Sequence, residues 1–405
     1  MSAGAQVVVL TNGPGELYTW ARPLIHALRS SGADLRIVLA LLPCPFASGY
    51  ERTAAQGLPV DAVVPVAQTL EFIAGGRRPE AFLAVSSGVV VGLGGDVNFP
   101  GRIGGRLGYP AWRYSFESFW HKSLERLFVH DAPTLERALS SGANATDIGN
   151  LTADALTLED VPAKQPGLDV IVVPGSRGFQ FTHLLPYFAG VAERVRAGVP
   201  DVRFHIPRSR LINDADFQTA LSGVNVKDFG GVPLRLEEIG SSRTLVTPDG
   251  THLELHDEDA RYGLMRNADF ALTVVGTNTL ELGIAGVPSL VCLPLQKMEL
   301  IPIENPLRYL EWLPVIGKPI KRRLVDAFLS RQRFISLPNR LADEAIQPEL
   351  RGDLPIEKVA GEAVRLLRDA AERARIRSRL EATMPRPGAA ARLADLILER
   401  VGLRA

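Results

Sequence analysis

Three consecutive residues with phosphate-binding chemistry, Gly175-Ser176-Arg177, follow an apolar run at Val170–Pro174 and precede a helical stretch. A glycine at this point lets the backbone approach a ligand closely, and the first N–H groups of a helix carry partial positive charge. Ser176 is a favourable helix cap, and Arg177 offers a forked donor that matches a phosphate. The pattern predicts a cradle for a diphosphate; a capped turn with a solvated arginine would have the same sequence.

A second turn of this kind lies at Gly276-Thr277-Asn278-Thr279, after the buried run Phe270–Val275. Thr277 and Asn278 are residue types that cap helices, so a plain helix cap is the alternative interpretation. Glu281 falls in the first turns of the expected helix, where a carboxylate is favoured and can accept two hydrogen bonds from a ribose diol. Two such turns in one half of the chain favour a nucleotide site.

Asp96 could act as a general base for a hydroxyl nucleophile. It follows the apolar run Val89–Leu93 in the segment Gly94-Gly95-Asp96-Val97-Asn98, so we expect it at the carboxyl end of a strand. A carboxylate there can take the proton of an attacking hydroxyl. An Asx turn or a helix cap would use the same residue.

Glu16 is a second acidic candidate. It follows Asn12-Gly13-Pro14-Gly15 after the first apolar run, and Gly15 leaves room for an acceptor substrate. The segment fails the dinucleotide-binding fingerprint because Tyr18 stands where the third glycine belongs. A tight turn between strand and helix is an equal alternative to acceptor contact.

Asn339, in Ser336-Leu337-Pro338-Asn339, could hydrogen-bond to a uracil edge or an ester oxygen, although the local sequence indicates only a turn before a polar helix start.

No metal site is predicted. The two cysteines, Cys44 and Cys292, exclude a disulfide framework and a cysteine-based zinc site. His252 and His256 lie close together in sequence on the expected hairpin; we interpret them as solvated strand residues, and a metal bound by the two is the alternative.

The elements that must position these residues alternate between short apolar runs, glycine turns and helical stretches. This is typical of doubly wound α/β domains with parallel sheets. We predict an N-terminal domain over residues 1–160, a second over 167–350, and a helical tail over 351–405 that packs back on the first domain. The segment 242–256 has the alternation and the Pro-Asp-Gly turn of a β-hairpin inserted into this pattern. The helix expected at 179–197 is interrupted near Pro186.

The composition excludes several classes of protein. The chain has 405 residues, with 45 basic and 45 acidic side chains, so it has no net positive charge that would attract nucleic acid. No apolar run is long enough to span a bilayer, and the N-terminus lacks a signal peptide's basic region. We expect a cytoplasmic protein, or one peripheral on the cytoplasmic face of the membrane. The stretch 305–333 combines apolar and aromatic residues with a basic cluster and could contact the membrane surface, or could be core helices with one basic face.

The chain resembles lipid-A-disaccharide synthase. The resemblance is carried by Pro174-Gly175-Ser176-Arg177, by Gly276-Thr277-Asn278-Thr279-Leu280-Glu281 with Gly286-Val287-Pro288, and by Ser336-Leu337-Pro338-Asn339 with Pro348-Glu349. The Ser336-Leu337-Pro338-Asn339 motif with Pro348-Glu349 is the most specific of the three. The resemblance as a whole covers most of the chain and is weak over the first 80 residues.

The resemblance implies a GT-B fold, in which two Rossmann-like domains face a cleft and the C-terminal one holds a UDP-sugar. The family's nucleotide-binding arginine falls on Arg177, its motif asparagine on Asn339, and its important aspartate on Asp96, with Asn98 completing the segment. Enzymes of this type generally need no metal or other cofactor. Family members are membrane-associated and can form dimers, so a homodimer is also expected.

The opening segment departs from the family. Gly15-Glu16-Leu17-Tyr18-Thr19-Trp20 stands where the family usually has Gly-Glu-x-Ser-Gly-Asp, and the segments 242–256 and 297–333 look like additions. The resemblance therefore implies that the chain binds the UDP-sugar donor as the family does, whereas its acceptor need not be a lipid A precursor.

The leading hypothesis is an inverting glycosyltransferase that moves an N-acetylglucosamine-type sugar from UDP to a lipid-linked or sugar hydroxyl. Asp96, or else Glu16, would be the base. The alternatives are a UDP-N-acetylglucosamine 2-epimerase-like enzyme and a non-catalytic nucleotide-sugar-binding protein at the membrane.

Overall fold

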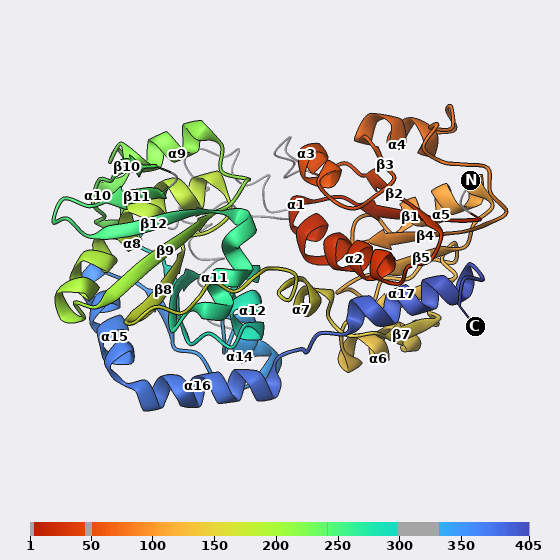
Figure 1. Ribbon diagram of the computed structural model, residues 1–405. Coiled ribbons are helices and arrows are strands. Elements are labelled where there is room, and N and C mark those ends of the chain that lie inside the picture. Colours follow the sequence, from red (N-terminus) through yellow and green to blue (C-terminus); the bar gives the residue numbers. More distant parts are fainter. Residues whose placement is uncertain (1–3, 45–50, 241, 298–331, 405) are drawn as a thin grey trace, which may run out of the picture. The chain divides into compact units, whose positions relative to one another are not determined.

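The computed structural model describes residues 4–44, 51–240, 242–297 and 332–404. It divides into two compact units, one of residues 1–158 and 385–405 and one of residues 159–384. Figure 1 shows a sheet with helices in each unit. The predicted tail over 351–405 is thus shared, because its last helix belongs to the first unit and the preceding ones to the second.

Unit 1 is a seven-stranded parallel sheet in the order β3-β2-β1-β4-β5-β6-β7. The strands are β1 (Ala5–Thr11), β2 (Leu35–Leu41), β3 (Ala62–Val64), β4 (Ser87–Leu93), β5 (Ala111–Tyr114), β6 (Arg126–Val129) and β7 (Ala145–Asp147). The helices are α1 (Pro14–Glu16), the π-helix η1 (Leu17–Ala21), α2 (Arg22–Ser30), α3 (Glu51–Gln56), α4 (Val66–Ile73), α5 (Asn98–Leu107), α6 (Ala132–Ser140), α7 (Leu151–Ala155) and α17 (Ala389–Arg400).

Both faces of the unit 1 sheet are buried, as the nearly continuous apolar strands require. Successive β1 residues point to opposite faces. Val7 and Val9 pack with α2 and α17, whereas Val8 and Leu10 pack with Phe72 and Ile103 from α4 and α5. Helix α17 therefore completes one layer of the unit 1 core.

Unit 2 is an eight-stranded mixed sheet in the order β10-β11-β12-β9-β8-β13-β14-β15. The strands are β8 (Leu168–Val173), β9 (Val202–Arg208), β10 (Arg235–Ile239), β11 (Ser242–Val246), β12 (His252–Asp257), β13 (Phe270–Val274), β14 (Ser289–Pro294) and β15 (Glu349–Gly352). The helices are α8 (Gly178–Gly198), α9 (Asp214–Leu221), α10 (Val226–Phe229), the 3₁₀ helix η2 (Glu258–Ala260), α11 (Arg261–Asn267), α12 (Thr277–Ile284), α14 (Leu337–Ala342), α15 (Ile356–Arg368) and α16 (Ala370–Thr383).

Two expectations about unit 2 can be compared directly with this topology. The hairpin is confirmed, because β11 and β12 pair antiparallel across the turn at 247–251, and β12 continues into the sheet beside β9. The predicted interruption of the long helix is wrong. Helix α8 runs through Pro186, which is buried inside it, and the Pro186 carbonyl accepts a hydrogen bond from the Val232 N–H.

Among the described helices, none combines the length and apolar character needed to cross a membrane. The stretch 305–333, predicted to contact the membrane surface, lies outside the described residues except for its last two.

Candidate active site

Each sheet has one point where the strand order reverses, and the predicted site residues flank these two points. In unit 1 the order leaves β1 toward β2 on one side and toward β4 on the other. In unit 2 it leaves β8 toward β9 and toward β13. The loops that follow the central strands diverge there, which makes these carboxyl ends the usual ligand site of doubly wound sheets.

The loop from β8 to α8 presents Gly175, Ser176 and Arg177 at the unit 2 switch point. Gly175 has φ +118°, a conformation that L side chains rarely adopt, so glycine is required there. The expected cap is corrected: the N-cap residue of α8 is Arg177, not Ser176, and its side chain makes no capping hydrogen bond. Ser176 and Arg177 are both exposed, so the arginine lies at the positive end of a 21-residue helix and in reach of solvent.

The loop from β13 to α12 forms the other side of this switch point. Gly276 is the N-cap residue and Thr277 is exposed. Asn278 and Thr279 are buried and stabilise the turn: the Asn278 amide donates to Thr273 Oγ1 and to the Val274 carbonyl, and Thr279 Oγ1 donates to the Gly276 carbonyl at 2.7 Å. The buried Asn278 and Thr279 therefore stabilise the turn, and Thr277 is its exposed residue.

Glu281 lies one turn further into α12 and is only 3% exposed. Its carboxylate forms an ion pair with Arg261 and accepts a hydrogen bond from the Tyr262 hydroxyl at 3.1 Å. Burial raises the pKa of the Glu281 carboxyl, and Arg261 and Tyr262 oppose that shift. These contacts join α12 to α11, and a ribose diol would have to share the carboxylate with them.

A small apolar pocket opens beside these loops, and no local sequence pattern predicts it. It is lined by residues of α8 and of the ends of β13 and β14, among them Phe179, Gln180, His183, Val275 and Pro294. Its place next to the start of α8 suits the flat base of a nucleotide whose phosphates lie at that helix end.

Asn339 is 1% exposed and makes four hydrogen bonds within the chain. Its Oδ1 accepts from the N–H groups of Ile346 and Gln347 at 2.9 and 2.8 Å, and its Nδ2 donates to the Gln347 carbonyl and Glu349 Oε1 at 2.8 and 2.9 Å. Glu349 in turn accepts from the Ser336 N–H at 2.8 Å. An amide has two donors and two acceptor positions, so none is left for a ligand in this conformation.

Replacing Asn339 by alanine should therefore lower the free energy of unfolding of the protein by about 1–3 kcal/mol, because two buried N–H groups lose their acceptor. Urea unfolding measures the change. The neighbouring exposed Arg340→Ala is the matched control and should be near neutral. Unchanged stability in Asn339→Ala, together with weaker nucleotide binding, would instead assign the amide to a ligand.

In unit 1, Asp96 is exposed at the switch point between β1 and β4. Its Oδ1 accepts hydrogen bonds from the N–H and the side-chain amide of Asn98 at 2.8 and 2.9 Å. This is an Asx turn at the start of α5. The local geometry of Asp96 is therefore the one expected from the alternative interpretation, an Asx turn or helix cap. The turn leaves the second carboxylate oxygen, Oδ2, outside these two bonds, and Asn98 fixes the direction of the carboxyl group.

Glu16 lies across the switch point from the Asp96 loop. Gly94 and Gly95 have φ +72° and +66°, and a Cβ on Gly94 would lie 2.9 Å from the Trp20 ring and 3.4 Å from Glu16 Cγ. The backbone conformation favours glycine at both positions, and the lack of space for a Cβ requires it at Gly94. Gly15 is exposed, and its carbonyl accepts from Thr19 Oγ1 at 2.8 Å within a helix that includes a π turn, a feature frequent at functional sites.

Arg113 is the residue that sequence reasoning missed. It lies on β5 next to β4 and is 3% exposed, and its guanidinium donates to the Gly95 carbonyl at 3.1 Å and to the Phe119 carbonyl at 3.2 Å. Burial lowers the pKa of Arg113, while the charges of Glu117 and Asp96 oppose that shift. A buried cation thus holds the loop that carries Asp96.

The sequence comparisons find similarity to lipid-A-disaccharide synthases. A sequence model of lipid-A-disaccharide synthetase matches residues 233–305. The lipid-A-disaccharide synthase of Trichlorobacter lovleyi is 27% identical over 74% of this chain and 72% of its own length. Those of Anaeromyxobacter dehalogenans and Geobacter sulfurreducens are 30% and 28% identical, over 56% and 72% of this chain and 48% and 66% of their own lengths. The match to these last two thus covers less than two thirds of each relative.

Solved structures with little sequence similarity share the fold. A UDP-GlcNAc 2-epimerase from Neisseria meningitidis, bound to UDP-GlcNAc, aligns with a TM-score of 0.55 at 10% identity over 98% of this chain and 99% of its own. MurG of Acinetobacter baumannii aligns with a TM-score of 0.50 at 13% identity over 98% and 99%. In sequence the chain is similar to lipid-A-disaccharide synthases, and its two Rossmann-like units share the GT-B fold with these solved structures.

Proposed function

We propose that unit 2 holds a UDP-sugar with its diphosphate at the start of α8 and α12. The observation that carries this proposal is the pairing of two loop-to-helix junctions on either side of the switch point between β8 and β13. Backbone N–H groups at both junctions and the exposed Arg177 are the donors that a diphosphate requires. The apolar pocket beside α8 would take the base, and the resemblance to lipid-A-disaccharide synthase favours an N-acetylglucosamine-type sugar.

Unit 1 supplies the acceptor site and the base in this proposal. Asp96 takes the proton of the acceptor hydroxyl as the oxygen attacks the anomeric carbon with inversion, and the bond to UDP breaks. Arg177 and the two helix N-termini stabilise the charge that develops on the departing UDP. Glu16 is the second candidate for the base, and Asn98 directs the Asp96 carboxylate.

The acceptor is proposed as a lipid-linked or glycan hydroxyl. The relatives favour a lipid-linked one, and Trp20, in place of the family's aspartate, favours a different acceptor surface. The Trp20 ring packs against Tyr114 and Phe116 with ring centroids 5.2 and 4.9 Å apart. Action at the cytoplasmic face of the membrane, membrane contact and a homodimer stay predictions.

Incubation of the protein with UDP-GlcNAc, with and without candidate acceptors, tests this function. Transfer requires an acceptor, so UDP-GlcNAc alone should stay unchanged apart from slow hydrolysis. A C2 epimer formed without acceptor would establish the epimerase alternative. UDP binding with no turnover for any acceptor would favour a binding protein.

Arg113→Met tests how the Asp96 loop is held. We expect kcat to fall by up to about 10²-fold, because the loop loses its anchor and the base moves from its productive position. UDP affinity should not change, since the donor site is in unit 2. Arg113→Lys keeps a donor near the Gly95 carbonyl and should recover part of the activity. Full activity in Arg113→Met would remove Arg113 from the positioning of Asp96.

A further inference from the structure

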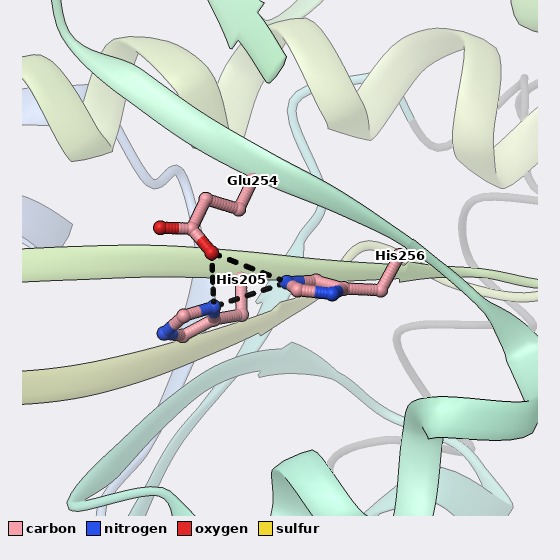
Figure 2. Close-up of side chains that lie close together, drawn as sticks. All are labelled: His205, Glu254 and His256. Carbon is pink, nitrogen blue, oxygen red and sulfur yellow. Dashed lines mark hydrogen bonds and ion pairs between the residues drawn. The ribbon is translucent and has the colours of Figure 1, made fainter. Parts of the chain in front are cut away.

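Three potential metal ligands converge on one face of the unit 2 sheet, away from the loops proposed to bind the donor. His205 lies on β9, and Glu254 and His256 lie on β12 (Figure 2). Glu254 is directly opposite His205 in the parallel pairing of these strands. Residues 254 and 256 share a face because strand side chains alternate, so the sheet itself brings the three side chains together.

The spacing of the three ligand atoms matches one metal ion. His205 Nδ1 lies 3.1 Å from His256 Nε2 and 3.4 Å from Glu254 Oε2, and the latter two atoms are 3.6 Å apart. Ligand atoms about 2.0–2.1 Å from a tetrahedral Zn²⁺ lie roughly 3.3 Å from one another. The three atoms therefore form one triangular face of such a site with almost no rearrangement.

A carboxylate behind His205 orients its ring. Asp169 Oδ1 lies 3.0 Å from His205 Nε2, so Nδ1, the other nitrogen, is directed at Glu254 and His256. Asp169 is itself held by Lys164 at 2.7 Å and by Arg203 at 2.6 Å. Metal-bound histidines almost always donate their second N–H to a carboxylate or a carbonyl, which fixes the tautomer.

The cluster can be reached from solvent. The side chains of His205, His256 and Glu254 are 13%, 27% and 47% exposed. Since Lys164 and Arg203 already offset the charge of Asp169, Glu254 contributes the negative charge that a cation would meet. With two histidines and one carboxylate, a fourth position stays open for water or a further ligand.

Without a metal, the same atoms must share protons. Burial alone would lower the pKa of His205, but the hydrogen bonds to Glu254 and Asp169 outweigh burial and raise it. Burial lowers the pKa of His256, and the neighbouring His205 lowers it further. A metal ion at the three ligand atoms would compete with these protons.

We propose that His205, Glu254 and His256 bind one zinc ion, with water as the fourth ligand. The site joins the hairpin strand β12 to β9, so the metal would stabilise this edge of the unit 2 sheet. The segment 242–256, expected to be an addition, lies within the residues that the lipid-A-disaccharide synthetase model matches. The proposal does not depend on the transferase reaction or on the donor site.

The test uses the full-length protein, freed of any histidine tag and stripped with a chelator. We expect calorimetry with Zn²⁺ to give one site per chain and Zn²⁺ to raise the unfolding temperature. Co²⁺ in its place should give the visible absorption of a tetrahedral complex. A wild-type protein that takes up no stoichiometric Zn²⁺ would overturn the proposal, and only a hydrogen-bonded cluster would remain.

Variants locate the ion. His205→Ala, Glu254→Gln and His256→Ala should each lose the stoichiometric site, and Asp169→Asn should weaken it by about 10–100-fold. The matched control is His252→Ala, an exposed histidine on the same strand that is not in the cluster. If His252→Ala and His256→Ala lost Zn²⁺ binding to the same extent, the assignment of the ligands would be contradicted. Circular dichroism checks that each variant is folded, and the wild-type titration decides alone where one is not.

Discussion

Asp96→Asn should reduce sugar transfer by about 10²–10⁴-fold, the usual contribution of a positioned general base. The substitution is conservative in shape. An asparagine oxygen can still accept the Asn98 N–H that now binds Asp96 Oδ1 at 2.8 Å, so the turn and the start of α5 should persist. UDP affinity should be unchanged. The loss would therefore appear in kcat and would report the missing proton acceptor.

Asp147→Asn is the matched control for this substitution. Asp147 also lies in unit 1, is exposed, and accepts a backbone hydrogen bond two residues on, from Gly149 at 2.8 Å, but it lies on the edge strand β7. It should keep full activity. Glu16→Gln separates the two candidate bases, because a loss of transfer in that variant with full activity in Asp96→Asn would move the role to Glu16.

Arg177→Ala should weaken UDP binding by about 1.5–3 kcal/mol, the scale of a hydrogen bond to a charged group. This corresponds to roughly 10–150-fold in the dissociation constant, measured by calorimetry. Arg177 is exposed at the N-terminus of α8, and substitutions of exposed side chains usually change stability little, so the fold should persist. Arg177→Lys should lose less UDP affinity than Arg177→Ala, because lysine keeps the positive charge but lacks the forked geometry of the guanidinium.

Arg196→Ala is the control for Arg177, since Arg196 is in the last turn of the same helix. It should bind UDP as the wild type does. Unchanged affinity in Arg177→Ala would remove this residue from the donor site and leave the helix N-termini as the remaining diphosphate donors.

The sequence predicts the fold well where local patterns are strong. Buried apolar runs followed by glycine turns locate the central strands, including the ends of β4, β8 and β13 at which the candidate residues lie. β10 was missed, because Arg235-Leu236-Glu237-Glu238-Ile239 pairs only at the sheet edge and has few apolar residues. The break predicted at Pro186 is wrong, because tertiary packing keeps α8 intact around a proline that by itself disfavours a helix.

The roles of single residues are less predictable, because they depend on contacts between distant segments. Nothing local shows that Asn339 would use all its hydrogen-bonding capacity on its own loop, or that Arg113 would support a loop 18 residues away. His205 and His256 are 51 positions apart, and only the pairing of β9 with β12 brings them together. The sequence pointed to His252 as the neighbour of His256, whereas the strand pairing selects His205.

A crystal structure of the protein with UDP-GlcNAc tests the central claim most directly. We predict the diphosphate within hydrogen-bonding distance of the backbone N–H groups that begin α8 and α12, with the Arg177 guanidinium on a phosphate oxygen and the uracil in the pocket beside Phe179. A nucleotide bound elsewhere in a fully occupied site would contradict the assignment of the donor to unit 2 and the mechanism built on it.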